Sequence, residues 1–514
     1  MSSTDVRAKF GSPAILGSLD HDRAGASEGP AILSAEAIEV ARRFTENAIS
    51  PAILLGMIRL IEFLALLAIG LIIYVGYVEP ESGFNISYLL PLTAGALLAM
   101  LFIQAADGYS IGSLRSIARQ MGRVIAAWTL VFATFAVAMF FLKMGEEYSR
   151  VWFAGWYLGG LGFLLVFRFG VALAIRQWNR DGRLQRRAVV VGGGEPAAEL
   201  IHSIEGASDS DIQICGVFDD RADDRSPAIV KGYPKLGTIS ELVEFARLAK
   251  IDLLIVSLPL TAENRLLQIL KKLWVLPVDI RLSAHSNKLR FRPRSYSYIG
   301  SVPFIDVFDK PITDWDSIIK RLFDLFFGTL ILLMVSPIMI ATAIAIKLDS
   351  KGPVFFRQKR YGFNNEAIEV WKFRSLYAEM SDFSAAKLVT KDDPRVTRVG
   401  RFIRKTSIDE LPQLFNVLVG TLSLVGPRPH AVTAKMADRL YEQVCDGYFA
   451  RHKVKPGITG WAQINGWRGE TDTQEKIRMR IEFDLHYIEN WSPFFDLQIL
   501  VLTPFSLLNN ENAY

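Results

Sequence analysis

Long apolar stretches separated by short polar links fill the chain between residues 60 and 175. A helix needs roughly 20 apolar residues to cross about 30 Å of hydrocarbon, and each of the four stretches has about this length. They run over residues 60–78, 86–106, 124–142 and 151–175. Any one of them could be a buried core helix, but four in succession predict a transmembrane unit of four helices over residues 51–178.

The charges in the links predict which side of a membrane the ends of this unit face. The first and third links are acidic and poor in lysine and arginine. The second link and the segment after the fourth stretch carry Arg115, Arg119, Arg123, Arg176, Arg180, Arg183, Arg186 and Arg187. Because arginine-rich flanks stay in the cytoplasm, we expect both ends of the unit there. Glu62 and Arg168 fall inside stretches, near enough to the ends for their charged groups to reach the interface.

Outside the apolar stretches, composition limits the number of domains and the kinds of site that the chain can form. At 514 residues, half of them apolar, the chain is long enough for two or three domains. Residues 1–50 are polar and mixed, so we expect a disordered cytoplasmic segment without a cleavable signal. Two distant cysteines, Cys215 and Cys445, exclude a disulfide framework and a Cys-rich zinc site.

The middle of the chain has the pattern of alternating strands and helices. Residues 187–205 read RAVVVGGGEPAAELIHSIE, which predicts a strand, a glycine turn and a helix. Gly192, Gly194 and Ala197 fit the dinucleotide-binding pattern, and Asp219-Asp220 end a second predicted strand where a ribose-binding acid is expected. We therefore expect a doubly wound α/β, Rossmann-like domain over residues 185–300. A lone glycine pattern more often serves packing, so the ligand stays open.

A fifth apolar stretch, residues 322–346, is interrupted by Asp324 and by Ser336-Pro337. Lysines and arginines lie on both sides of it, so both flanks favour the same face of the membrane. Proline inside a helix removes a backbone donor and bends it, and the adjacent serine can satisfy the freed carbonyl. We expect a re-entrant helix, residues 320–347, that enters the inner leaflet and returns.

The strongest candidate chemistry follows this stretch. Asp409 and Glu410 are adjacent, and arginines and lysines surround them in RVGRFIRKTSIDELPQLF, residues 398–415. Adjacent carboxylates repel each other unless cations hold them. A divalent metal or a phosphate-rich ligand with arginine partners would resolve that conflict. The alternative is a solvated helix face with ordinary ion pairs.

Several blocks resemble those of a known family in their order. They are KRLFD, GPVFFRQKRYG, WKFRS, TSIDELPQLFNVL, LSLVGPRP, RHKVKPGITGWAQINGWRG and YIENWS. This set resembles the bacterial sugar transferases, the polyprenyl-phosphate hexose-1-phosphate transferases. The whole chain is similar to their long members, the undecaprenyl-phosphate glucose phosphotransferases of exopolysaccharide synthesis. The resemblance implies a monotopic, mainly helical catalytic domain over residues 315–514.

The resemblance also implies a reaction. Hexose-1-phosphate would move from a UDP-sugar to undecaprenyl phosphate, with release of UMP, at the bacterial inner membrane. Asp409 matches the family's nucleophile, Glu410 matches the second acid, and both would lie at a Mg²⁺ ion. The phosphate-binding candidates are Arg404, Lys372, Arg374, Arg428, Arg451 and Lys455. We expect lipid of the inner membrane and no nucleic acid as partners, and the sequence leaves a homo-oligomer open.

Two other classes of protein share parts of this pattern. Four membrane helices before a glycine-turn domain are also typical of membrane-bound nucleotide-sugar dehydratases, which need a Tyr-x-x-x-Lys pair. No tyrosine in the chain has a lysine four residues later. A membrane scaffold with a degenerate transferase part would be expected to lack the acidic pair. The sugar stays open: glucose is the first choice, with galactose or an N-acetylhexosamine as alternatives.

Overall fold

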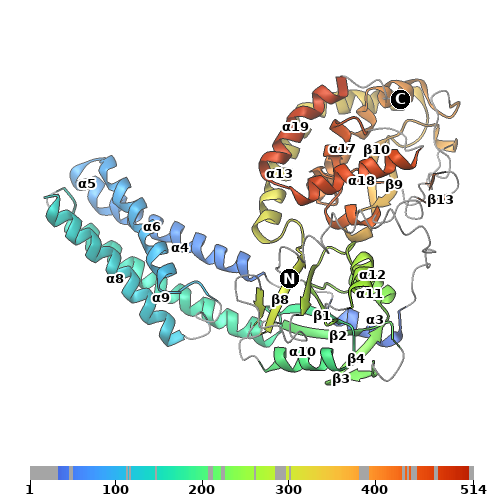
Figure 1. Cartoon of the computed structure of the whole chain (residues 1–514). Coiled ribbons are helices and arrows are strands. Elements are labelled where there is room, and N and C mark those ends of the chain that lie inside the picture. The colour runs from blue at the N-terminus through green and yellow to red at the C-terminus, as the bar shows by residue number, and fades with distance from the viewer. Residues whose placement is uncertain are drawn as a thin grey trace. The chain divides into compact units, whose positions relative to one another are not determined.

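The computed structural model describes most of the chain, which folds as two compact units (Figure 1). The described residues are 33–44, 50–110, 114, 117–144, 147–206, 212–221, 226–259, 262–283, 297–299, 302–380, 393–430, 435–436, 439–440, 448–467 and 473–508. One unit contains residues 47–186 and 211–213, and the other contains the remainder. Arg115 and most of the segment expected to be disordered lie outside the described residues.

The smaller unit is built from long apolar helices. They are α4 (Pro51–Ile73), continued by a π-helical turn (Tyr74–Val78) and α5 (Glu79–Ser82), then α6 (Leu89–Ala105), α8 (Ile117–Phe141) and α9 (Arg150–Arg180). Five helices in the described chain are long and apolar enough to cross a membrane, four of them here. Tryptophans hold the bundle together: the indole N–H of Trp152 donates to Gly70 O and that of Trp156 to Leu66 O, both at 2.9 Å.

Glu62 and Arg168 do not behave as expected. Both side chains are fully buried in this unit and pair with each other. Arg168 Nη2 donates to Glu62 Oε2 at 2.9 Å, and Tyr109 Oη donates to the same oxygen at 2.6 Å. The expectation that these charges reach an interface is therefore wrong. A charge that finds an opposite charge and hydrogen bonds inside a helix bundle has no need to reach water.

A mostly parallel sheet forms the Rossmann-like domain. Its strand order is β3-β4-β2-β1-β5-β6-β8-β7, with β1, β5 and β6 parallel and β8 antiparallel to β6. The strands are β1 (Arg186–Val191), β2 (Ile212–Phe218), β3 (Ile229–Val230), β4 (Tyr233–Gly237), β5 (Leu253–Val256), β6 (Asp279–Ser283), β7 (Ser297–Ile299) and β8 (Val302–Phe308). The helices are α10 (Glu195–Glu205), α11 (Ile239–Leu248) and α12 (Glu263–Leu273). The order reverses at β1, where a doubly wound sheet places its ligand crevice.

The glycine turn after β1 is filled by the protein itself. Gly192 and Gly194 have φ values of 95° and 79°, which other residues rarely adopt. The N–H of Gly193 donates to Asp219 Oδ2 at 2.8 Å, and Arg221 Nη2 donates to the same oxygen at 2.8 Å. One of the two carboxylates that the sequence suggested for a ribose thus binds the backbone of the turn itself. This arrangement favours a packing role for the turn.

Part of the segment expected to be disordered is a helix. α3 (Ala35–Arg43) begins at Ser34, whose side chain caps it, and Ala37 and Ala41 are buried. Phe44 O, just after this helix, accepts from the Arg187 guanidinium and from Lys250 N. A short amphipathic helix among polar residues gains its stability from packing on the sheet domain, which composition does not reveal.

The last part of the chain combines helices with small sheets. Its helices are α13 (Asp314–Asp349), α14 (Arg398–Lys405), α15 (Gln413–Val419), α17 (Trp461–Ile464), α18 (Gln474–Glu489) and α19 (Pro493–Leu508). Short 3₁₀ helices are η4 (Phe363–Asn365), η5 (Ala378–Met380), η6 (Ile408–Glu410) and η7 (Tyr448–Lys453). The strands β9 (Phe355–Tyr361) and β10 (Ala367–Phe373) pair antiparallel, as do β12 (Lys435–Met436) and β13 (Arg439–Leu440), while β11 (Ser423–Val425) and β14 (Gly457–Thr459) pair parallel.

α13 stays helical through Pro337, so its residues form one helix of 36 residues. Ser336 Oγ donates to Leu333 O at 2.9 Å. This is the carbonyl that would have received the missing N–H of Pro337, so the expected compensation by serine is confirmed. Apolar side chains such as Phe326 and Met334 are exposed along the helix. Its re-entrant course through a membrane remains a prediction.

Lys320 and Arg321, which precede the apolar part of α13, bind groups of the surrounding elements. Lys320 Nζ donates to Asp496 Oδ2 at 2.6 Å and to Val425 O at 2.9 Å, and it lies 3.7 Å from Asp324. Arg321 donates to two carbonyls at the C-terminal end of α15. Both cations therefore tie α13 to the surrounding elements, and the side of the membrane that they face stays a prediction.

Lys320→Met should destabilise this unit strongly. The change leaves the buried carboxylates of Asp496 and Asp324 without their cation, which costs about 3–5 kcal/mol in comparable buried pairs. The midpoint of thermal unfolding of the purified protein in detergent measures the effect. Lys351→Met, the same change at an exposed lysine after the helix, is the matched control. Equal midpoints for both variants would show that the buried pair contributes nothing.

Candidate active site

A residue with left-handed backbone angles directly precedes the short helix that carries the acidic pair. α14 ends at Lys405, and Ser407 follows with φ 58° and ψ 15° before η6, which carries Asp409 and Glu410. Few residues other than glycine adopt this conformation, and such strain concentrates at functional sites. After the pair, Pro412 has helical backbone angles and caps the N-terminus of α15.

Glu410 is held by two cations from distant parts of the chain. Lys372 Nζ on β10 donates to Glu410 Oε1 at 2.9 Å. Arg428, which follows β11, donates from Nη2 to the same oxygen at 2.6 Å and from Nη1 to Oε2 at 3.2 Å. Burial alone would raise the pKa of Glu410, but Arg428 and Lys372 outweigh it and hold the pKa well below its usual range. Glu410 is therefore an ionised anchor.

Asp409 is left unengaged beside this anchor. Its carboxylate makes no hydrogen bond or ion pair with any residue that the structure describes. Burial raises the pKa of Asp409, Lys372 and Arg404 oppose the rise, and Glu410 adds to it. The two neighbours thus differ in role: one carboxylate is fixed in ion pairs, and the other is open to react or to bind a ligand.

Arg360 on β9 belongs to the same cluster, which the sequence did not reveal. Its guanidinium donates to Gln358 Oε1 and to Pro429 O, next to Arg428. Burial and Arg428 lower the pKa of Arg360 to about 10, while Glu410 opposes the shift. The motif GPVFFRQKRYG contains this residue, but spacing gave no sign of its partner. Four cations, Arg360, Lys372, Arg404 and Arg428, thus act on two carboxylates, an excess of positive charge that suits phosphate groups.

A buried network lies behind Arg428. Arg451 Nη2 donates to Arg428 O at 2.9 Å and pairs with Asp484 at 2.5 Å. Arg451 Nη1 also contacts His430 Nδ1 at 2.8 Å, and Tyr448 Oη lies 2.7 Å from the same nitrogen. Burial and Arg451 hold the pKa of His430 well below its usual range, so the ring is neutral and can accept. Arg451, His430 and Asp484 support the turn that carries Arg428.

Three predicted phosphate ligands therefore lie elsewhere or are already engaged. Arg451 is buried and engaged in the network described above. Arg374 donates to Ser350 O, Ser350 Oγ and Lys351 O, and so closes the loop after α13. Lys455 is exposed, and the charges that act on it are Arg321 and Asp324 rather than the acidic pair. Their assignment as phosphate contacts is not supported by this geometry, which selects Lys372, Arg404 and Arg428.

The residues present fit a metal ion that arrives with a phosphate ligand. Both oxygens of Glu410 accept from cations, whereas those of Asp409 are free to coordinate. Among the described residues, no group of three or more His, Cys, Asp or Glu side chains could hold an ion. Mg²⁺ typically takes one or two carboxylates and completes its shell with water and substrate phosphates. Asp409 is thus the fitting protein ligand, and Glu410 is the weaker candidate.

Comparisons with known proteins agree with these observations. Residues 315–510 match the family model of the bacterial sugar transferases, and residues 104–284 match that of a CoA-binding domain. The UDP-glucose:undecaprenyl-phosphate glucose-1-phosphate transferase of Escherichia coli (strain K12) is 35% identical over 474 residues, 91% of this chain and 98% of that protein.

Two further relatives match a smaller share of the chain. The exopolysaccharide production protein PSS of Rhizobium leguminosarum bv. phaseoli is 45% identical over 199 residues, 39% of this chain and 100% of that protein. The UDP-N-acetylgalactosamine-undecaprenyl-phosphate N-acetylgalactosaminephosphotransferase of Aeromonas hydrophila is 42% identical over 196 residues, 38% of this chain and 45% of that protein. The residues that match the bacterial sugar transferase family model, 315–510, include the acidic pair.

Glu410→Gln should change how stability depends on pH. The folded pKa of Glu410 is depressed, so its ion pairs stabilise the fold above about pH 4.5 and are lost as pH falls through the folded pKa. The variant should be less stable at pH 7, and the two unfolding curves should converge on acidification. Thermal midpoints measured from pH 7 to pH 3 test this. Glu379→Gln, at an exposed residue, is the control, and parallel curves for wild type and Glu410→Gln would contradict the assignment.

Proposed function

Because this chain belongs to the bacterial sugar transferase family, we propose that it transfers glucose-1-phosphate from UDP-glucose to undecaprenyl phosphate. The chain is a transferase of the undecaprenyl-phosphate sugar-phosphate class. One observation carries the mechanism: Glu410 is held by Lys372 and Arg428, while the adjacent Asp409 has no partner among the described residues. Such a site has an open nucleophile within a cationic field, as transfer of a phosphoryl group requires.

The reaction proceeds in two displacements at one phosphorus atom. A carboxylate oxygen of Asp409 attacks the phosphorus that bears the glucose. The bond from this phosphorus to the bridging oxygen breaks, and UMP leaves with that oxygen and its electron pair. The phosphate of undecaprenyl phosphate then attacks the same phosphorus. Asp409 departs as a carboxylate, and undecaprenyl-diphospho-glucose forms.

The cations make these displacements feasible. Both substrates are anionic, so the approach of one to the other requires neutralisation of charge. Arg428 and Lys372 are fixed by Glu410 and so are positioned before substrate binds. Arg360 adds charge beside Arg428, and Arg404 favours the ionised form of Asp409. Loss of one such fixed donor typically costs about 10²–10³-fold in kcat.

We also propose Mg²⁺ as the metal, held by an oxygen of Asp409. Mg²⁺ supplies charge neutralisation on the diphosphate and orients it for attack. The support is the donor set: an oxygen-only carboxylate that is free to coordinate, beside cations that can share the phosphates. Glu410 serves this site by holding Lys372 and Arg428 in place.

The protein is a membrane protein, and we place its catalytic part on the cytoplasmic side of the inner membrane. The arginine-rich links support this orientation, and UDP-sugars are cytoplasmic. α13 would then enter the inner leaflet and return, with its exposed apolar side chains in lipid. The name of the Rhizobium relative supports a role in exopolysaccharide production, for which this transfer would be the first membrane step.

Asp409→Asn should abolish turnover while leaving the fold intact. Purified protein is incubated with Mg²⁺, undecaprenyl phosphate and a panel of UDP-glucose, UDP-galactose and UDP-N-acetylgalactosamine, and UMP is measured. We expect UMP from UDP-glucose, at least about a 1,000-fold loss in Asp409→Asn because the amide is a poor nucleophile, and loss with EDTA.

Other outcomes of this panel are equally informative. UMP from another sugar would correct the donor and keep the mechanism, as the Aeromonas relative allows. No UMP from any donor, in folded protein supplied with lipid, would exclude the transferase reaction and favour a scaffold. Full activity in Asp409→Asn would exclude Asp409 as the nucleophile.

Arg404→Gln should move the acid limb of the pH profile. Ionised Asp409 is the attacking form, so activity falls as pH drops through its pKa, which burial has raised. Arg404 opposes that rise, so its removal raises the pKa further and the limb moves to higher pH. The logarithm of kcat/KM plotted against pH measures the shift. Arg401→Gln, on the same helix but not acting on Asp409, should leave the limb unchanged; a limb that stays in place in Arg404→Gln would contradict the role.

A further inference from the structure

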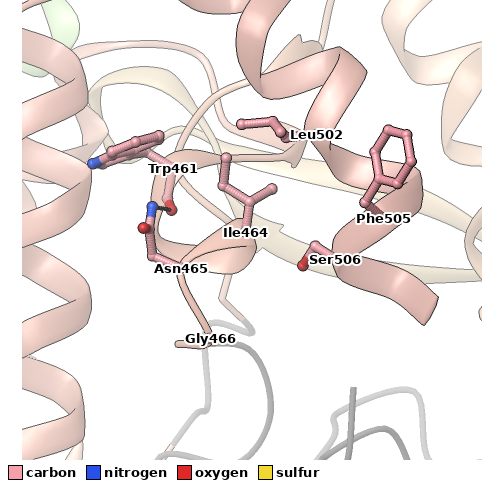
Figure 2. Close-up of a pocket in the computed structure, with 7 residues that line it drawn as sticks. All are labelled: Trp461, Ile464, Asn465, Gly466, Leu502, Phe505 and Ser506. Carbon is pink, nitrogen blue, oxygen red and sulfur yellow. Dashed lines mark hydrogen bonds between the residues drawn. The ribbon is translucent and has the colours of Figure 1, made fainter. Parts of the chain in front are cut away.

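A pocket of about 360 Å³ lies between α17 and the C-terminal half of α19 (Figure 2). Trp461 and Ile464 line it from α17, and Leu502 and Phe505 line it from α19. Figure 2 shows Ile464 between the indole of Trp461 and the ring of Phe505. Asn465 is also at the pocket, but its amide nitrogen already donates to Trp461 O at 2.8 Å. Gly466 and Ser506 complete the lining, so four of the seven lining residues present apolar or aromatic side chains that can contact a hydrocarbon ligand.

The pocket continues an apolar surface. Phe505 is 61% exposed, and Phe494 and Val501 on the same helix are also exposed. α19 packs on α13, whose exposed side chains are apolar and which is long enough to enter a membrane. Water is a poor environment for so much apolar surface. The continuity with a membrane helix indicates an occupant that comes from the lipid phase.

The pocket also lies close to the cationic cluster. Gly460, directly before Trp461, packs so tightly on Gly426 that an added Cβ would lie 2.2 Å from Gly426 O. Gly426 N donates to Thr459 O at 2.8 Å, and Arg428 follows two residues later. Consecutive Cα atoms are about 3.8 Å apart, so the Cα atoms of Trp461 and Arg428 lie within roughly 20 Å. A short hydrocarbon chain can bridge that distance.

We propose that this pocket binds the isoprene units nearest the phosphate of the polyprenyl phosphate acceptor. The inference rests on the proposed function, in which Arg428, Arg360 and Lys372 neutralise the charge of the two anionic substrates. The acceptor joins an anionic end to a branched, uncharged chain, which matches a cationic cluster beside an apolar pocket. The UDP-sugar is polar throughout and does not match the pocket walls. The volume is at the lower end for ligand pockets, so only the first few units fit.

The test compares acceptors of different chain length on the full-length enzyme in detergent. The probes are undecaprenyl phosphate and a five-carbon prenyl phosphate, which is too short to reach the pocket. Phe505→Ala should lower the ratio of their kcat/KM values about tenfold, mainly through KM for undecaprenyl phosphate, because an aromatic wall is lost. Phe494→Ala, the same change at an exposed position of α19 outside the pocket, should leave the ratio unchanged.

A second readout separates this inference from the reaction itself. Exchange of labelled UMP into UDP-glucose needs no lipid and reports the first displacement alone, so Phe505→Ala should keep wild-type exchange. Phe505→Leu should restore much of the chain-length ratio. An unchanged ratio in Phe505→Ala, or an equal fall in Phe494→Ala, would overturn the pocket assignment. Loss of exchange in Phe505→Ala would mean a structural role and would also overturn it, whereas absence of exchange in wild type would overturn the proposed mechanism and this inference with it.

Discussion

The arrangement of the site depends on the ion pairs of one carboxylate. Glu410 accepts from Lys372 and Arg428, and both cations are partly buried with it. A buried charge is tolerated only with good partners, so the three groups hold one another in a defined geometry. These ion pairs also determine the state of the adjacent residue, Asp409. Asp409 lies in the same positive field but pairs with neither Lys372 nor Arg428, so its carboxylate is available to a ligand or to an electrophile.

Polar contacts hold in place the two elements that carry Lys372 and Arg428. β10, which carries Lys372, is anchored because Asn416 on α15 accepts from Trp371 N and donates to Glu369 O. The turn that carries Arg428 is held by Arg451, which in turn pairs with Asp484 on α18. The removal of either support would change the position of a cation without touching any ligand. Positioning of this kind explains why so many charges of the domain are buried.

A second set of buried charges joins α13 to the same domain. Asp496 at the start of α19 accepts from Lys320 and Tyr487, and Asp324 accepts from Ser423 Oγ and Leu424 N. This second set contacts β11, and Arg428 of the first set lies in the turn that follows the same strand. The helix that would lie in the lipid and the cluster that would bind phosphates therefore share one strand. This is the physical basis on which a lipid-borne phosphate could meet a nucleotide sugar at Asp409.

The sequence by itself determined the apolar helices, the strand-turn-helix pattern of the middle domain and the candidate pair Asp409-Glu410, because these depend on composition and local spacing. Only the tertiary structure decided which cations act on that pair. Lys372 and Arg428 do, whereas Arg374 and Arg451 are engaged elsewhere and the overlooked Arg360 joins the cluster. An arginine can donate to a carbonyl, a carboxylate or a phosphate with equal ease, so its role depends on which acceptor the fold brings within reach. The pairing of Glu62 with Arg168, 106 residues apart, was hidden for the same reason.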